Sequence, residues 1–378
     1  MSQVLPEFSY FDIIISDVNN EQITPQPIYY SQSRNLPYLY QPDKYNLSVL
    51  RWTADTSTLP IFRCQIKPNS TSAVDSIYSI TLVYNGTPAQ VFLQYSSQQI
   101  NLEIPAPPSD TISGLQDNST LYYDVYSYQF VIMLINQTFQ AAFEKLVELT
   151  GLSTTVYAPF FTFDTNLNIA ILNAAVDGYN LNTNGIQIFF NPALANLFST
   201  FPYYLVNQIS TTGQNYQVAV NVFNQAGTTI YSFVDNTGTV VSYNIYQIFQ
   251  ESSTITALNP VVAIVMCSNS LPVLPTNVAG TFLYSKPGSS INPSGNNAQT
   301  NNVITDFVSD TGLYRSNIVY TPSAEYRRLT LNAGTDALTN LDISLYWRDR
   351  LGGLNPLLLA SGSTVTIKLL FELKIKNY

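Results

Sequence analysis

Apolar and polar residues alternate along much of this chain, and the alternation is clearest near its C-terminal end. Residues 341–348 and 364–376 both place apolar side chains at every second position, which is the period of a strand with one buried face. We expect these two segments to be core strands that pair with each other. The positions expected to face the core are Leu341, Ile343, Leu345, Trp347, Val365, Ile367, Leu369, Phe371, Leu373 and Ile375.

The rest of the chain predicts many more short strands, roughly 16 in all, separated by turn residues. The best hairpin signal is Asn85-Gly86 between two alternating segments, because both residues tolerate positive φ. Runs of short strands without regular intervening helices are typical of β-sandwiches and not of βαβ folds. The sequence therefore predicts an all-β fold, and the strand total exceeds one eight-stranded jelly roll.

Two segments predict helices. Residues 137–150 carry apolar residues at helical spacing and stop at Gly151, and a shorter helix is expected after Asn191 as N-cap with Pro192 at its first position. The aromatic segment just before the first helix, 121–135, is expected to be a strand. The positions expected on the apolar face of the first helix are Phe139, Phe143, Leu146 and Leu149.

Domain boundaries are placed from composition and periodicity. Residues 1–43 are rich in Pro, Gln, Asn and Tyr with little periodicity, so we expect an extended N-terminal arm that lies on another surface and is dispensable for folding. Residues 44–200 are expected to form a first β module with a helix near 137–150. Residues 201–378 are expected to form a second β module that closes with strands 341–348 and 364–376. The second module could be tandem or inserted.

Composition limits the partners. Only 10% of the 378 residues are charged, against about 25% in ordinary globular proteins. A polar but uncharged surface suits broad contacts with neighbouring subunits, because charges are costly to desolvate. The net charge of −9 argues against nucleic acid as a direct partner. The longest apolar run, 261–267, is too short to cross a bilayer, and the N-terminus has no signal-peptide pattern, so we expect a soluble chain.

Catalytic chemistry has few candidates here. The chain contains no histidine, which removes His-dependent triads, general bases and zinc sites. Cys64 and Cys267 are isolated in apolar runs and are expected to be two buried thiols, although spacing alone leaves a disulfide possible. No phosphate-binding loop or nucleophile-elbow motif is present. We therefore expect no catalytic, cofactor-binding or metal-binding residues, no cofactor and no enzyme activity.

Charged residues gather in the last quarter of the chain. The acids could in principle hold Ca²⁺ or act as a glycosidase pair, but solvated or salt-bridged carboxylates are the favoured interpretation. The basic residues could form forks to carboxylates of another subunit or pair locally, and both remain open. The acids are Asp306, Asp310, Glu325, Asp336, Asp342 and Asp349, and the basic residues are Arg315, Arg327, Arg328, Arg348, Arg350, Lys368, Lys374 and Lys376.

Several segments of the closing half resemble one family of viral proteins. The stretches VITDF (303–307), YTPSAEYRRLTL (320–331) and LDISLYWRDRLGGLNPLLLASGSTVTIKLLF (341–371) are similar to minor capsid or penton proteins of Polinton-like viruses, adintoviruses and virophages. IQIFFNPALANLFSTFP (186–202) and NPVVAIVMCSNSLPV (259–273) show the same similarity. The resemblance rests on a diffuse pattern over about residues 186–378, extends weakly to the region from NLSVLRW to LPIFRCQIK (46–67), and carries no catalytic motif.

The resemblance implies a jelly-roll virion protein of a small double-stranded DNA virus, made in the host cytoplasm or nucleus. We expect a structural subunit that self-assembles as a homo-oligomer, a pentamer at a penton, and contacts other subunits of an icosahedral capsid. Two alternatives stay open at this point. One is a double jelly-roll major capsid subunit, and the other is a β-sandwich spike that binds a receptor or carbohydrate through exposed tyrosines.

Overall fold

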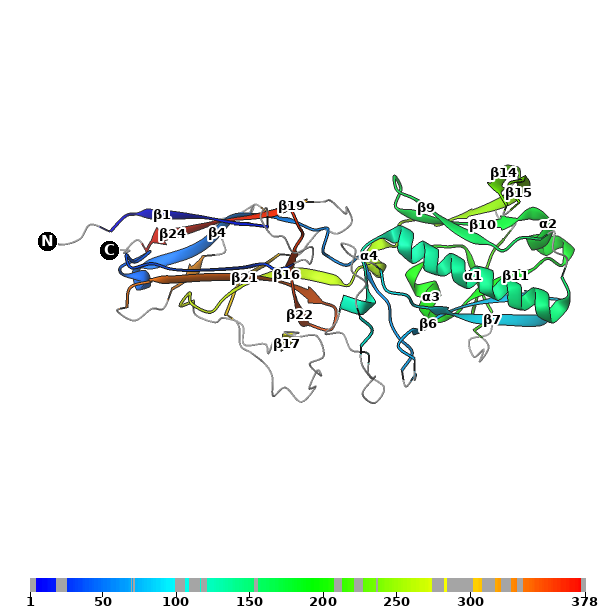
Figure 1. Ribbon diagram of the computed structural model, residues 1–378, viewed down its shortest axis with the longest axis horizontal. Helices are drawn as coiled ribbons and strands as arrows, with labels where there is room; N and C mark the ends of the chain where they lie inside the picture. Colours follow the sequence, from blue (N-terminus) through cyan, green and yellow to red (C-terminus); the bar gives the residue numbers. More distant parts are fainter. Residues whose placement is uncertain are drawn as a thin grey trace.

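Two large hydrophobic cores divide the described part of the molecule into two lobes that lie end to end along its long axis (Figure 1). The terminal lobe is built from both chain ends, residues 8–59 and 261–373, and the inserted lobe from residues 61–258. Both termini lie at the far end of the terminal lobe. The computed structural model describes residues 5–17, 26–68, 70, 72–98, 106–108, 116, 121–152, 156–206, 213–220, 227–235, 237–273, 282–283, 302–307, 317–320, 328–331 and 336–374.

The terminal lobe is a sandwich of two sheets. The first sheet has the order β1 (Phe8–Ser16), β24 (Thr364–Leu373), β4 (Tyr45–Asp55), β19 (Asn317–Tyr320), with β20 (Leu329–Thr330) also on β4. The second has the order β17 (Phe282–Leu283), β22 (Gly353–Pro356), β21 (Asn340–Asp349), β16 (Val261–Ser268), β18 (Asn302–Phe307), with β3 (Tyr29–Ser33) on β21. A short ladder joins β2 (Gln26–Pro27) to β23 (Leu358–Leu359), and a 3-10 turn covers Pro42–Lys44.

The core of this lobe lies between β24 and β21. Val365, Ile367, Leu369 and Phe371 are each at most 1% exposed, which confirms the predicted buried face of the last strand. The predicted pairing of the two strands is wrong. β24 pairs with β4 and β1, whereas β21 pairs with β16, β22 and β3. Alternation identifies which face of a strand is buried but not its neighbour, and here the two apolar faces meet across the sandwich.

The N-terminal residues take part in both sheets. β1 pairs with β24 over nine residues, from Phe8 opposite Glu372 to Ser16 opposite Thr364, and β3 pairs with β21. Ile13, Ile28 and Leu39 are buried in the core. These pairings show that residues 8–16 and 29–33 are strands of the sandwich, and they argue against a dispensable arm. Its weak periodicity arises because β1 contributes one fully buried residue, Ile13, and its other positions are partly or largely exposed.

Phe371 offers a test of the core of the terminal lobe. Its ring is fully buried and meets the Phe11 ring edge-on at 5.3 Å between centroids. We expect Phe371→Ala to lower the free energy of unfolding by about 3 to 5 kcal/mol, through lost burial and the cavity left behind. Lys368→Ala on the outer face of the same strand should cost about 0.5 kcal/mol. Equal small shifts of both variants in chemical melts would show that β24 is peripheral.

The inserted lobe places one long helix between two sheets (Figure 1). One sheet has the order β12 (Tyr203–Leu205), β13 (Tyr216–Val218), β11 (Gln187–Phe190), β6 (Asp75–Tyr84), β7 (Thr87–Gln94). The other has the order β14 (Thr229–Val234), β15 (Val240–Phe249), β10 (Ile169–Ala175), β9 (Phe160–Asp164), and a short ladder joins β5 (Phe62–Arg63) to β8 (Asp124–Val125). The helices are α1 (Tyr128–Thr150), α2 (Val176–Tyr179), α3 (Pro192–Leu197) and α4 (Ile255–Leu258), with 3-10 turns at Leu121–Tyr123 and Leu181–Thr183.

Helix α1 is the centre of this lobe. The Phe139 ring contacts Phe161 of β9 at 5.6 Å and Phe190 of β11 at 6.0 Å, so one side chain reaches both sheets. The strand expected at 121–135 is wrong over most of its length, because residues 121–123 form a 3-10 turn, only Asp124–Val125 are in a strand, and the helix already begins at Tyr128. Burial at helical spacing outweighs the strand preference of the aromatic and β-branched residues there. The buried apolar positions are Val131, Ile132, Leu134, Ile135, Phe139, Ala142, Phe143 and Leu146.

The sequence signals for turns and helix ends in this lobe predict the structure better than the strand pattern of 121–135 does. Asn85 and Gly86 take φ of 50° and 78° in the turn between β6 and β7, as the hairpin signal predicts. Gly151 ends α1 with φ of 63° and donates its N–H to the Val147 carbonyl at 2.8 Å. Asn191 caps α3 by accepting a hydrogen bond from the Leu194 N–H at 3.1 Å. These three predictions are confirmed.

The observed strand pairs cross the expected boundary at residue 200. β10 pairs with β15, although the boundary places them in different modules, and β4 pairs with β24 in the same way. The chain enters the inserted lobe after Leu59 and returns before Val261. Composition could not locate this insertion, because both crossings consist of ordinary apolar and polar residues and no linker marks them.

Candidate functional site: the junction between the lobes

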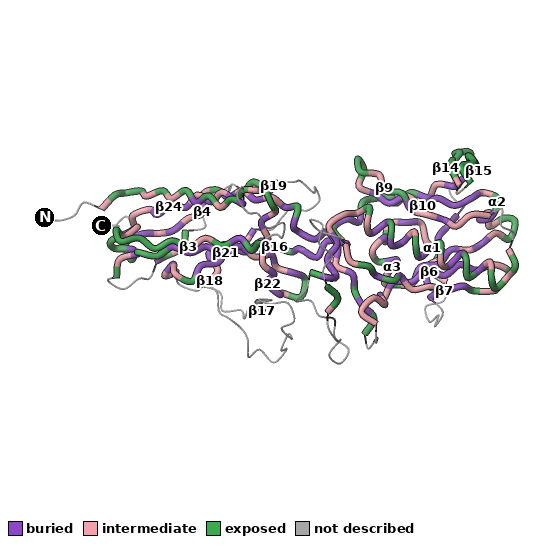
Figure 2. Tube along the Cα trace, viewed as in Figure 1, coloured by how far each residue is buried: buried purple, intermediate pink, exposed green. Residues whose placement is uncertain are grey.

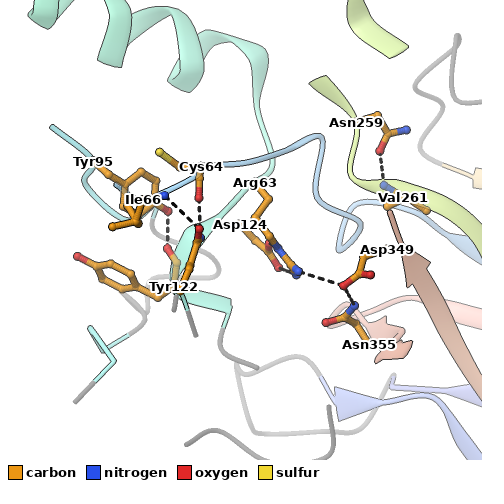
Figure 3. A network of polar contacts seen from close by, with 11 residues as sticks. Arg63, Cys64, Ile66, Tyr95, Tyr122, Asp124, Asn259, Val261, Asp349 and Asn355 are labelled. Atoms are coloured by element: carbon orange, nitrogen blue, oxygen red, sulfur yellow. Dashed lines mark hydrogen bonds and ion pairs between the residues drawn. The ribbon is translucent and has the colours of Figure 1, made fainter. Parts of the chain in front are cut away.

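Arg63 occupies the place where the two lobes meet (Figure 3). Its Nε donates to Asp124 Oδ1 at 2.6 Å and its Nη2 donates to Asp124 Oδ2 at 3.2 Å, in a two-pronged ion pair. Its Nη1 lies 3.5 Å from Asp349 Oδ2, which belongs to the terminal lobe. The guanidinium carbon also lies 5.0 Å from the Trp347 ring centroid. One cation therefore links both lobes.

Strand pairing positions these groups. Arg63 in β5 lies directly opposite Asp124 in β8, so the short ladder presents one side chain to the other. Asp349 ends β21 and accepts hydrogen bonds from the N–H groups of Leu351 at 2.9 Å and Gly353 at 2.8 Å. The Asp349 carboxylate thus stabilises the turn into β22 and also forms the ion pair with Arg63.

The arrangement is electrostatically demanding, because one guanidinium faces two buried carboxylates. The Asp124 side chain is fully buried, and that of Asp349 is 4% exposed. Burial raises the pKa of Asp124, and the nearby Asp349 charge raises it as well. The charge and hydrogen bonds of Arg63 lower this pKa but do not outweigh burial, so the net pKa is above its ordinary value. Arg63 offsets part of the desolvation cost of keeping these acids inside, so removing it should leave a buried charge without compensation.

Other hydrogen bonds hold both crossings of the chain. On the return crossing, Arg350 Nε donates to the Asn259 carbonyl at 3.0 Å and its Nη2 donates to the Thr256 carbonyl. Asn259 Oδ1 accepts from the Val261 N–H at 2.9 Å, just where β16 begins. On the outward crossing, Thr58 Oγ1 donates to the Leu358 carbonyl at 2.7 Å. The junction is therefore braced by hydrogen bonds on both connecting segments.

The candidate acids that the structure describes do not come together in a reaction site. Asp342 and Asp349 lie in the same strand and are both engaged in hydrogen bonds within the lobe, while Asp310 and Glu325 lie outside the described residues. Asp306 is half-buried in β18, and Asp336 is exposed. Among the residues that the structure describes, no group of three or more His, Cys, Asp or Glu side chains could hold a metal ion.

Asp342 instead fastens the turn after β16. Its carboxylate accepts from Ser268 Oγ at 2.8 Å, from the Ser270 N–H at 2.6 Å and from the Asn269 N–H at 3.0 Å. Burial raises the pKa of Asp342, and hydrogen bonds from Ser270, Asn269 and Ser268 lower it. Together the hydrogen bonds outweigh burial, so the net pKa is below the ordinary value.

The lowered pKa of Asp342 predicts that the folded protein becomes less stable in acid. A carboxylate with a lowered folded-state pKa contributes stability above its unfolded pKa, and the contribution is lost as the pH falls through the folded-state value. We expect the free energy of unfolding to fall as the pH drops below about 4, and to fall less steeply in Asp342→Asn. Chemical melts across pH 2.5 to 7, about the range in which carboxylates titrate, measure this slope. A variant with the same slope as the parent chain would contradict the assignment.

Most of the described basic residues near the C-terminus contact groups within the terminal lobe or at the junction. Arg328 Nε lies 3.1 Å from Glu372 Oε2, Lys368 Nζ lies 3.7 Å from Asp12 Oδ2, and Lys374 donates to the carbonyls of Asp43 and Leu331. Arg315, Arg327 and Lys376 lie outside the described residues. Sequence reasoning passed over Arg63, whose signal is one charge inside the apolar run IFRCQI.

Both cysteines are free and buried, which confirms the predicted pair of thiols. Burial raises the pKa of the Cys64 thiol well above its usual range and that of Cys267 to about 12. A thiol with a raised pKa is a poor nucleophile and metal ligand. No helix in the described part of the chain is long and apolar enough to cross a membrane.

Comparison with known proteins shows which family has this two-lobed fold. A family model described as Sputnik minor capsid protein V18/19 matches residues 9–373, almost the whole chain. The chain belongs to this family. The match covers both lobes, so the inserted lobe is part of the family's design.

Related proteins of two virophages support this family assignment. The uncharacterized protein V18 of Sputnik virophage is 32% identical over 158 residues, which cover 41% of this chain and 92% of that protein. A chain of the Sputnik virophage cryo-EM structure superimposes with a TM-score of 0.80 at 27% identity over 98% of both chains. The mavirus penton protein shares the fold, with a TM-score of 0.61 at 15% identity over 97% of this chain and 99% of that one.

These comparisons confirm three predictions. The resemblance to virophage capsid and penton proteins is correct, and the jelly-roll sandwich agrees with the structural neighbours. The chain is a minor capsid protein with a structural role in the virion. For a protein with that role, the braced junction fixes how the inserted lobe is held on the terminal lobe.

Proposed function

We propose that this chain is the penton subunit of its virion and forms a homopentameric ring at the five-fold vertices, in contact with other capsid subunits. The observation that carries the proposal is the likeness of both lobes together to the mavirus penton protein, with 97% of the chain covered. Closed cyclic rings require one surface of a subunit to bind a different surface of its neighbour. Such a subunit works structurally and needs neither cofactor nor catalytic group, and its host makes it in the cytoplasm or nucleus.

The surface of the terminal lobe supports this role. Large apolar side chains are exposed on several of its strands and loops, although isolated chains normally keep such groups apart or cover them. This surface carries few charged groups whose desolvation would disfavour its burial in an interface. In a closed ring, many weak contacts together stabilise the assembly. The net charge of −9 makes direct binding of the genome unfavourable. The exposed residues are Phe8, Tyr10, Ile14, Tyr29, Leu36, Tyr40, Val262, Val319 and Leu351.

Light scattering coupled to size exclusion tests the ring. At micromolar concentration we expect a species of five times the 42.1 kDa chain mass. Ile14→Asp, which puts a charge on the exposed side of β1, should shift the species to monomer without unfolding it. Leu167→Asp, at a similarly exposed position of the inserted lobe, is the matched control and should leave the ring intact; the parent residues are 67% and 63% exposed. A parent chain that stays monomeric across salt and pH would refute the proposal.

A further inference from the structure

The sheet of β14, β15, β10 and β9 has two different faces. At the end of the inserted lobe remote from the termini, the β14–β15 hairpin extends this sheet outward (Figures 1 and 2). One face of β10 and β9 packs on the lobe's core through Leu172, Ala174 and Phe161. The strand register places Phe160, Asn173 and Gln247 on the opposite face, together with the hairpin residues Thr229, Tyr231, Phe233, Val241 and Tyr243. We call this second face the aromatic face.

Five rings adjoin one another on the aromatic face. Tyr231 and Phe233 lie side by side along β14, with centroids 6.2 Å apart and planes within 29°. Phe160 of β9 meets Tyr231 at 4.6 Å, and Tyr157 stacks on Tyr243 at 4.5 Å with planes within 15°. All five side chains are partly exposed rather than buried. The rings therefore form one connected cluster that solvent still reaches, in which Tyr231 and Phe233 are nearly parallel and Tyr243 meets both edge-on. We call this cluster the platform.

Neutral hydrogen-bonding groups continue the platform. Thr229 Oγ1 lies 3.2 Å from Gln247 Oε1, Gln247 Nε2 donates to Asn173 Oδ1 at 3.2 Å, and Asn173 Nδ2 donates to Thr162 Oγ1 at 3.1 Å. Asn173 is buried and fully engaged, but the threonines at the two ends of this row are exposed. The sole charged residue of the four strands on this face is Asp164, whose carboxylate accepts from the Asn166 and Leu167 N–H groups in the β9–β10 turn.

We propose that the aromatic face binds a neutral carbohydrate chain, with the rings of Tyr231, Phe233 and Phe160 stacking on its sugar rings. The C–H groups on one side of a pyranose are apolar and slightly positive, and they fit the negative face of an aromatic ring. Sugar hydroxyls then find the exposed threonines, the Gln247 amide and the tyrosine hydroxyls. An anionic glycan would require basic groups, and a protein strand would be recognised through deeper apolar pockets.

The hairpin is preorganised for such contact. At its tip, Asp235 Oδ1 accepts from the N–H groups of Thr237 at 2.8 Å and Thr239 at 2.9 Å, which fixes the turn. Ser232 and Ser242 hydroxyls lie 2.7 Å apart across the two strands. A rigid platform loses little conformational entropy on binding, and this compensates for the modest energy of each stacking contact.

Calorimetric titration tests this site. The probes are cellohexaose, chitohexaose and mannopentaose, with a heparin hexasaccharide as the charged counterpart, and the protein is the full chain in its assembled form. We expect at least one neutral probe to bind and the heparin probe not to bind. Tyr231→Ile, which keeps strand preference and apolar volume but removes the ring, should weaken binding by about tenfold or more. Tyr231→Phe should retain most of the affinity.

Ile230→Ala is the matched control, because Ile230 is the neighbouring residue on the other face of β14 and is 67% exposed. It should leave the affinity unchanged. Absence of binding by every neutral probe to the parent chain would overturn the proposal, as would equal affinity of Tyr231→Ile and the parent. If Tyr231→Ile instead dissociated the ring, the face would be a subunit contact. Ring mass and sugar binding are separate measurements, so failure here leaves the penton proposal untouched.

Discussion

A chain that begins at Tyr45 will fail to fold its terminal lobe cooperatively. The truncation removes β1 and β3, which pair with β24 and β21 along much of the length of those strands. It also uncovers the core beside Phe371 and deletes the buried side chains of Ile13, Ile28 and Leu39. Each lost apolar residue is worth about 1.5 to 3 kcal/mol by area, which together approaches the whole stability of an ordinary domain. Circular dichroism melts should show loss of the cooperative transition of this lobe.

Adjacent positions of β1 provide the control for that experiment. Ile13 is 3% exposed and points into the core, whereas its neighbour Ile14 points to solvent. Ile13→Ala should cost about 2 to 5 kcal/mol, and Ile14→Ala about 0.5 kcal/mol or less. A truncated chain with an unchanged melt, together with equal effects of the two substitutions, would restore the dispensable arm that composition suggested.

Arg63→Ala should be the most damaging single substitution at the junction. It leaves Asp124 and Asp349 buried without their cation, and the loss of one partner from a buried ion pair costs about 3 to 5 kcal/mol. We expect the melting transition to fall accordingly and the two lobes to lose their fixed arrangement. Melts followed by fluorescence of Trp52 and Trp347 would report on the terminal lobe, where both tryptophans lie, and Trp347 would also sense the loss of Arg63 beside its ring.

Two comparisons make this result specific. Arg51→Ala removes an exposed arginine from β4 and should cost about 0.5 kcal/mol or less. Arg63→Lys keeps the charge but loses the two-pronged geometry, so its cost should fall between the two alanine variants. An Arg63→Ala variant as stable as Arg51→Ala would mean that the junction is held by apolar packing alone.

The sequence predicted local features well because each depends on a few neighbouring residues. Alternation fixed the buried face of 364–371, and Asn85-Gly86 and Asn191-Pro192 fixed a turn and a helix start. Strand neighbours depend on contacts between distant residues, and for this reason the pairing of β24 with β4 and β1 could not be read from periodicity. The same limit hid the role of residues 8–16.

Two misjudged regions share a physical cause. The segment 128–135 has the residue types of a strand, yet burial between two sheets makes it helical. Arg63 looked like an incidental charge, yet the fold brings Asp124 and Asp349 to it from positions 61 and 286 residues away. In both cases tertiary contacts decide the outcome, and one sequence does not display them. The family resemblance did not depend on those contacts and was correct.

Electron microscopy of the purified assembly shows directly whether the chain forms a five-fold ring. We expect ring-shaped particles whose class averages have five-fold symmetry, with five two-lobed subunits arranged around one axis. Each subunit should show the terminal and inserted lobes end to end, as they lie in Figure 1. Images that show only single two-lobed particles, or rings of three-fold symmetry, would contradict the assignment of this minor capsid protein to the five-fold vertex.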